Sequence, residues 1–148
     1  MSDVNKKLTN LEVSNIYNYF NRNEDNTFPM LELLNQFSVK AKWAFRINLK
    51  KIEEIVKLYN DVLKDLQLEY SDDEHSIEST ETDDKGKETT IRTVKDKYIK
   101  EYQDKMQELL NQENDISVRT ININDIADVK LDFVDLEMLS FMIDEWFT

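Results

Sequence analysis

The stretch that decides the fold is Ala41–Leu66, which reads AKWAFRINLKKIEEIVKLYNDVLKDL. Eight of its residues follow one another at alternating intervals of four and three, and we call them the seam: Ala41, Phe45, Asn48, Ile52, Ile55, Tyr59, Val62 and Leu66. This heptad-like spacing predicts a long helix that lays one face on another helix. Asn48 is the one polar member, and a buried Asn in such an interface usually fixes the register at some cost in stability.

A second long helix is expected over residues 93–112, where an apolar stripe recurs at helical spacing: Val94, Tyr98, Tyr102, Met106 and Leu109. We expect it to run antiparallel to the seam, so that the two helices form a helical hairpin. Between them, residues 71–90 carry eight acidic and two basic side chains, and we call them the acidic segment. They contain one apolar side chain, Ile77, and the only glycine, Gly86, which predicts a flexible loop.

Shorter elements flank this pair of helices. Thr9 and Glu12 match the capping-box pattern, which predicts a first helix over residues 8–20. Residues 116–123 and 129–133 are β-branched or alternating, and we expect them to pair with each other as a small two-stranded unit. A final helix is expected from about Asp132 or Asp135, because acidic side chains favour the positive end of the helix dipole.

The predicted fold is therefore mainly α. It consists of an antiparallel helical hairpin, short N- and C-terminal helices and a minor two-stranded β element. We expect one domain over residues 1–148, with residues 71–90 as its flexible acidic loop.

The composition excludes several kinds of functional site. The chain has 148 residues and a formal net charge of −12, with no cysteine, one glycine and one histidine. Without cysteine there is no disulfide, thiolate metal centre or cysteine nucleophile, and a single glycine rules out glycine-rich phosphate loops. His75 stands among acidic neighbours, which solvated charge explains better than a metal site. We expect no metal, no cofactor and no catalytic residue.

Charge and hydropathy also limit the partners. An anionic surface repels phosphate, so we expect no direct binding of nucleic acid. No stretch approaches the roughly 18 uninterrupted apolar residues that a membrane span needs. Residues 1–7 are polar and do not resemble a secretory signal, so we expect a cytoplasmic protein that does not contact membranes.

Three surfaces are candidates for binding a partner. The first consists of carboxylates of the acidic segment: Asp72, Asp73, Glu74, Asp83 and Asp84. The second is Trp43 with Ile47, which lie away from the seam and form an exposed anchor unless the first helix covers them. The third, which we call the basic stripe, is Lys42, Arg46 and Lys50. The basic stripe suits a nucleotide phosphate or an acidic partner, but a solvated face explains it equally.

Several runs of the sequence carry a resemblance. They are FSVKAKWAFRINLKKI at 37–52, ELLNQE at 108–113, ISV at 116–118 and LEMLSFMIDE at 136–145. Together they resemble a group of small proteins from tailed phages of Gram-positive bacteria, known only as a domain of unknown function. The resemblance implies a phage origin and expression inside a bacterial host, and it transfers no active-site residue. Shorter members of the group lack so long an insertion as residues 72–88.

These observations favour a non-enzymatic interaction protein, made by a phage, that binds and inhibits a host protein in the bacterial cytoplasm. The acidic segment would occupy a basic surface that normally holds nucleic acid, as an anti-defence protein does, because complementary charge speeds encounter and selects partners. Two alternatives stay open. One is a virion or assembly component, which would form an oligomer of this chain. The other is a binder that sequesters a nucleotide signal on the basic stripe.

Overall fold

The computed structural model describes residues 3–21, 30–126 and 128–144. In this part of the chain 59% of the residues are helical and 24% lie in strands, so the fold is α+β. The prediction of a mainly α fold with one minor β element is therefore wrong. It failed because the strand-forming segments at 3–9, 76–82 and 88–94 carry too few apolar side chains to show the alternation of a half-buried strand.

Two compact units make up the fold. Unit 1 contains residues 1–57 and 113–148, and unit 2 contains residues 58–112. The long helix α3, Val39–Glu69, supplies residues to both units. Within the described ranges, no helix combines the length and the apolar character that crossing a bilayer requires.

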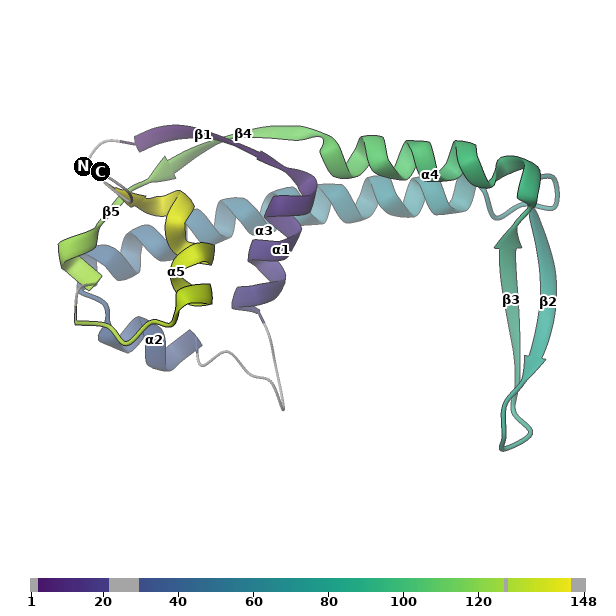
Figure 1. The fold of residues 1–148 in the computed structure, drawn as a ribbon, viewed down its shortest axis with the longest axis horizontal. Helices are drawn as coiled ribbons and strands as arrows, with labels where there is room; N and C mark the ends of the chain where they lie inside the picture. The colour runs from purple at the N-terminus through teal and green to yellow at the C-terminus, as the bar shows by residue number, and fades with distance from the viewer. Residues whose placement is uncertain (1–2, 22–29, 127, 145–148) are drawn as a thin grey trace. The chain divides into compact units, whose positions relative to one another are not determined.

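The main sheet of unit 1 joins the N-terminus to the last third of the chain (Figure 1). β1 (Asp3–Thr9) and β4 (Glu113–Arg119) run antiparallel, with Asp3 opposite Arg119 and Thr9 opposite Glu113. β4 turns Ile116 and Val118 into the core, whereas β1 buries only Leu8. The strand predicted over residues 116–123 thus pairs, as β4, with β1, a polar segment whose sequence does not predict a strand.

A second, very short pair lies in the same unit. β5 (Ile121–Asn122) and β6 (Ile143–Asp144) run parallel. Residues 129–132 belong to no strand, and Phe133 begins a helix. The predicted pairing of residues 116–123 with 129–133 is therefore wrong.

Helix α1 (Asn10–Phe20) begins two residues after the predicted start, directly after the predicted capping residue Thr9. The Oγ1 of Thr9 accepts a hydrogen bond from the backbone N–H of Glu12 at 3.2 Å, and the Glu12 carboxylate accepts one from the N–H of Thr9 at 3.0 Å. These two bonds satisfy N–H groups that the first turn of a helix leaves unpaired, so the predicted capping box is confirmed.

Helix α5 (Phe133–Leu139) has the same kind of start. The N–H of Asp135 donates to Oδ1 of Asp132 at 2.8 Å, and the N–H of Asp132 donates to Oδ2 of Asp135 at 3.2 Å. The Tyr19 hydroxyl also donates to Asp135, which joins α1 to α5. Both carboxylates thus have structural roles, which confirms the predicted helix start.

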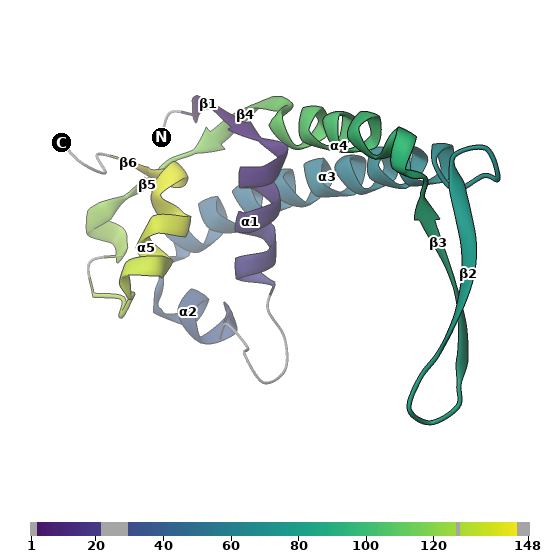
Figure 2. The same ribbon diagram turned by 45° about the vertical axis from the view of Figure 1, so that its right-hand side comes forward.

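The core of unit 1 gathers around the first part of α3. Helices α1 and α5 lie side by side across it (Figure 1, Figure 2). α2 (Met30–Gln36) and the 3₁₀ helices η2 (Ile123–Ile126) and η3 (Ser140–Met142) complete the unit. The largest fully buried side chains are all here: Phe20, Phe45, Leu34, Ile52, Ile116, Ile121, Leu139, Met142, Val13, Val118 and Asn48.

The seam is divided between the two units. Ala41, Phe45, Asn48 and Ile52 are fully buried in the core of unit 1, where most of the other elements of this unit contribute side chains. The expectation that one partner helix covers the whole seam is therefore wrong. In unit 2, Leu66 is buried but Val62 is 41% exposed.

Unit 2 contains the end of α3, a hairpin of two strands and the helix α4 (Asp96–Asn111), which runs back antiparallel to α3 (Figure 1). The strands are β2 (Ser76–Thr82) and β3 (Glu88–Val94), and we call the pair the hairpin. Its register sets Ser76 opposite Val94 and Thr82 opposite Glu88. The acidic segment therefore contains β2 and part of β3, which corrects the expectation of an irregular loop.

Candidate functional site

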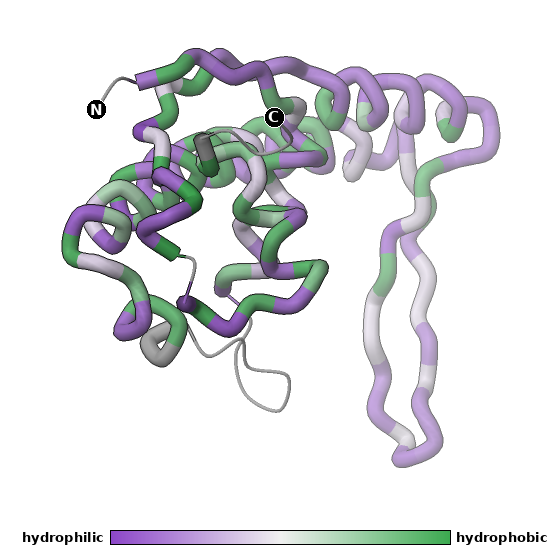
Figure 3. Tube along the Cα trace, turned by 60° about the vertical axis from the view of Figure 1, so that its left-hand side comes forward, coloured by the Kyte–Doolittle hydropathy of each residue, from purple (hydrophilic) through white to green (hydrophobic). Residues whose placement is uncertain are grey.

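The hairpin presents almost all of its side chains to solvent. Along β2 every residue except Ser76 is exposed, and along β3 only Ile91 and Val94 are half-buried. Figure 3 shows a trace that is hydrophilic over most of the hairpin. Residues 71–94 carry eight acidic and three basic side chains, so this part of unit 2 has a net charge of −5.

Alternation along the strands gives the hairpin two different faces. One face carries the opposed pair Glu78 and Arg92, whose carboxylate and guanidinium lie 3.8 Å apart. The other face carries Ile77 and Ile91, which are diagonal neighbours in the register. Each face thus offers a different chemistry to a partner.

The base of the hairpin is held by Arg92. Its guanidinium donates to Asp73 Oδ1 and to Ser76 Oγ, each at 2.8 Å. The hydrogen bond to Asp73 raises the pKa of Arg92, so this cation stays charged. Two of the predicted partner-binding acids lie at the base of the hairpin. Asp73 forms an ion pair with Arg92, and the next residue, Glu74, is exposed.

Asp72 organises the turn that enters the hairpin. Its Oδ1 accepts from the backbone N–H of His75 at 3.0 Å and lies 2.6 Å from the ring Nδ1 of the same residue. The hydrogen bond from the His75 ring is the largest influence that lowers the pKa of the Asp72 carboxyl below 3.8. Asp72 is thus engaged within the turn.

Asp72, Glu74 and His75 bring three ligand-type atoms within 4.8 Å of one another. This is the kind of grouping that binds cations. The hydrogen bond between Asp72 and His75 accounts for most of this proximity, and two of the three side chains are exposed. The geometry gives no independent indication of an ion.

A cluster of rings connects the hairpin base to the helices. Tyr70 is 2% exposed, and its ring centroid lies 5.2 Å from that of His75 and 5.1 Å from that of Tyr102. Tyr98 packs on His75 with the centroids 4.6 Å apart. Tyr98 and Tyr102 therefore pack within unit 2, against the turn that precedes β2 and against Tyr70 after the end of α3.

The tip of the hairpin is a tight turn built by Asp83. Its Oδ1 accepts from the N–H groups of Lys85 and Lys87 at 2.9 and 2.8 Å. Gly86 takes φ of +79°, which a residue with a side chain rarely adopts. Asp83 therefore shapes the turn, and its neighbour Asp84 is exposed.

The remaining predicted surfaces lie in unit 1. Trp43 is 62% exposed and Ile47 is half-buried, so α1 does not cover the Trp43 ring. In the basic stripe, Lys42 is half-buried while Arg46 and Lys50 are exposed. No carboxylate of the described residues forms an ion pair with the basic stripe.

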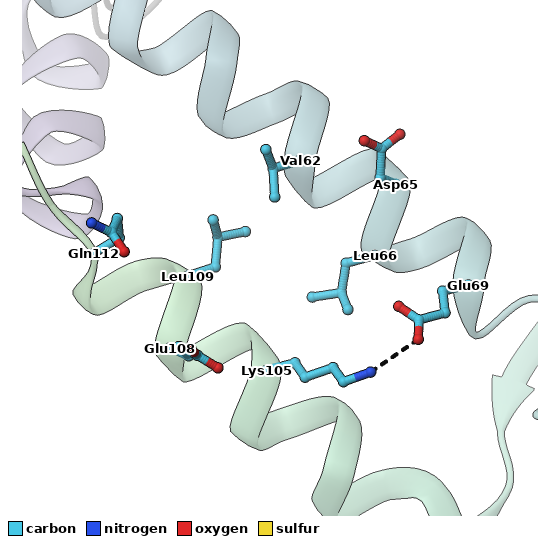
Figure 4. A pocket seen from close by; sticks show the side chains of 8 residues that line it. All are labelled: Val62, Asp65, Leu66, Glu69, Lys105, Glu108, Leu109 and Gln112. Carbon is cyan, nitrogen blue, oxygen red and sulfur yellow. Dashed lines mark hydrogen bonds and ion pairs between the residues drawn. The ribbon is translucent and has the colours of Figure 1, made fainter.

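Sequence reasoning missed a pocket of about 480 Å³ between α3 and α4 within unit 2 (Figure 4). We call it the groove. Val62 and Leu66 from α3 and Leu109 from α4 form its apolar lining. Polar side chains surround them: Asp65, Glu69, Lys105, Glu108 and Gln112. The seam and the stripe of the second helix contain these apolar residues, but their spacing does not reveal how closely two helices approach.

One ion pair closes the end of the groove. Lys105 Nζ lies 2.9 Å from Glu69 Oε1 and 5.1 Å from the centroid of the Tyr70 ring. The hydrogen bond to Glu69 raises the pKa of Lys105 above 10.5, and burial raises the pKa of the Tyr70 hydroxyl above 10.0. At neutral pH Lys105 is therefore charged and Tyr70 is neutral.

Comparisons with known proteins returned no matching family model, no matching curated protein and no matching solved structure. The resemblance to phage proteins therefore stays a prediction.

Proposed function

We propose that this chain is a non-enzymatic, phage-encoded binding protein that acts in the bacterial cytoplasm. It attaches through the hairpin to a basic surface of a host protein and inhibits that protein. The observation that supports this proposal is the exposure of the hairpin, whose surroundings in residues 71–94 have a net charge of −5.

The physical reason is that the hairpin gains little from the rest of the chain. A two-stranded hairpin is only marginally stable in water, and this one buries a single residue, Ser76, of its two strands. Binding a partner that covers one face or one free edge would add the missing contacts. An acidic element of this kind fits a surface that normally holds nucleic acid, because that surface is basic.

Affinity capture from a bacterial lysate tests the proposal. The hairpin variant replaces Glu81, Asp84 and Glu88 with Lys, and the control variant replaces Glu54, Asp128 and Glu137, which are exposed in unit 1, with Lys. Both variants change the net charge by the same amount. We expect the native chain and the control to capture the same partner and the hairpin variant to lose it.

Salt provides a second criterion. Binding driven by exposed charges weakens as ionic strength rises, because the Debye length falls from about 10 Å at 0.1 M to about 3 Å at 1 M. Equal capture by the hairpin variant, affinity that does not change with salt, or no partner for the native chain would contradict the proposal. A large stoichiometric assembly in light scattering would favour a virion component instead.

A further inference from the structure

We propose that the groove between α3 and α4 of unit 2 binds a basic amphipathic helix of a partner protein. This inference rests on the proposed function only in requiring a protein partner. The groove is a different surface from the hairpin, so the two can be tested separately.

Unit 2 lacks a core of its own. All of residues 58–112 are described, and their buried apolar side chains are Leu66 and Tyr70. Helix α4 has no buried residue, and Leu58 of α3 is 64% exposed. A unit of this size needs more burial than two side chains supply, since each contributes only about 1.5–3 kcal/mol. An occupant of the groove would supply further burial.

The shape of the groove suits a helix. Its α3 wall is formed by residues four and three apart, Val62, Leu66 and Glu69. The opposite wall repeats this spacing with Lys105 and Leu109 of α4 and with Gln112, the C-cap of this helix. The apolar side chains of the two helices point toward the same space (Figure 4). Leu58 lies one turn before Val62 on the same face of α3, where it is 64% exposed. Two parallel walls of this kind accept a third helix, which places its own apolar side chains between them.

The groove is also negatively charged. Three carboxylates surround the groove, on Asp65, Glu69 and Glu108, and its one ammonium, on Lys105, already pairs with Glu69. An occupant with Lys or Arg beside its apolar stripe would neutralise the carboxylates of Asp65 and Glu108. A second copy of this chain would bring the same carboxylates together in a twofold interface, which costs free energy. The charge therefore selects a basic helix rather than a dimer.

The test uses the full chain and a synthetic probe. The probe is a labelled peptide of Leu and Lys, about 18 residues and about 27 Å long as a helix, with Leu on one face. Its matched counterpart has Glu in place of Lys. We expect saturable binding of one Lys peptide per chain and at least tenfold weaker binding of the Glu peptide.

Two pairs of variants locate the binding site. Val62→Lys places a charge inside the groove, and Leu68→Lys places the same charge on an exposed residue of α3 that does not line it. We expect a loss of affinity of about tenfold or more for Val62→Lys and less than about twofold for Leu68→Lys. The double variant Asp65→Asn with Glu108→Gln should weaken binding, whereas Glu81→Gln with Glu88→Gln on the hairpin should not. Circular dichroism and thermal unfolding confirm that each variant is folded.

Several outcomes would overturn the inference. These are equal binding of both peptides, equal affinity of Val62→Lys and Leu68→Lys, or a dimer of the native chain that Val62→Lys dissociates. The last result would assign the groove to a second copy. A different result would contradict the proposed function, namely capture of the host partner by the hairpin variant. That result does not depend on whether the peptide binds.

Discussion

Asn48 and Arg119 are joined by two hydrogen bonds inside unit 1. The Nδ2 of Asn48 donates to the backbone carbonyl oxygen of Arg119 at 2.7 Å, and the backbone N–H of Arg119 donates to Oδ1 of Asn48 at 2.8 Å. Asn48 is fully buried, so one side-chain amide satisfies both backbone groups of the last residue of β4. The sequence predicted a buried Asn that sets helix–helix register, whereas the structure shows one that fastens a helix to a strand.

Replacing Asn48 with Ala should therefore be costly. Both backbone groups of Arg119 would lose their partner, and an unsatisfied buried group costs about 1–3 kcal/mol, so we expect a loss of roughly 2–4 kcal/mol in the free energy of unfolding. Urea denaturation measures this loss. The control is Asn60→Ala, at an exposed position of the same helix, which should change stability by less than about 0.5 kcal/mol. Equal effects of the two substitutions would contradict the assignment.

Replacing Ser14 with Ala should increase the free energy of unfolding. The Ser14 hydroxyl is buried and has no hydrogen-bond partner among the described residues. Ser14→Ala removes this unsatisfied group and improves helix propensity, so we expect stabilisation of roughly 0.5–1.5 kcal/mol. Ser38→Ala serves as the comparison, because the Ser38 hydroxyl accepts from the N–H of Ala41 at 3.1 Å at the start of α3. That substitution should destabilise by about 1 kcal/mol, and thermal unfolding should separate the two.

The stability of unit 2 should fall at alkaline pH. The pKa of Lys105 is raised above 10.5 by Glu69, and the pKa of Tyr70 is raised above 10.0 by burial. Folding thus favours the protonated form of both groups. Their contribution is complete below about pH 10 and is lost as the pH rises through the folded values.

A pH series of urea midpoints, followed by far-UV circular dichroism, measures this effect. Lys105→Met removes one of the two groups and keeps the length of the side chain, so its alkaline loss of stability should be smaller than that of the native chain. Lys100→Met, on an exposed residue of α4, is the control and should leave the pH dependence unchanged. Identical curves for Lys105→Met and the native chain would show that this ion pair does not contribute.

Hydrogen exchange should distinguish the two units. We expect slow exchange for amides of β4 and the first half of α3, which lie in the core of unit 1, and fast exchange for amides of β2, β3 and α4. Few buried apolar contacts protect the latter, and local opening is easiest where such contacts are few. This measurement also tests the predicted mobility of residues 71–90. Protection of the hairpin equal to that of β4 would contradict it.

Local features of this protein could be inferred without its structure. The capping boxes of Thr9 with Glu12 and of Asp132 with Asp135 join residues three apart, so the sequence contains both partners of each hydrogen bond. The length of α3 follows in the same way from spacing within one segment. These predictions succeeded because helical contacts are short-range in the chain.

The sequence indicated some of the candidate surfaces and not others. The acidic character of residues 71–90 follows from residue type. The sequence left open whether the first helix covers Trp43, and only the structure shows that this residue is 62% exposed. The groove could not be found in this way, because its volume depends on how far apart α3 and α4 lie. The sequence predicts that Asp72 and Asp83 are exposed acids. It does not predict their hydrogen bonds to His75 and within the turn at Gly86, which give them structural roles.

The amino-acid sequence alone determined the capped starts of α1 and α5, which face of α3 is apolar and where the negative charge concentrates. Only the tertiary structure decided that β1 pairs with β4, that Asn48 binds Arg119 and that Val62 borders an open groove. The reason is physical. Propensity, capping and periodicity act between neighbours in the chain, whereas strand pairing and burial depend on which distant segments compete successfully for the same apolar surface.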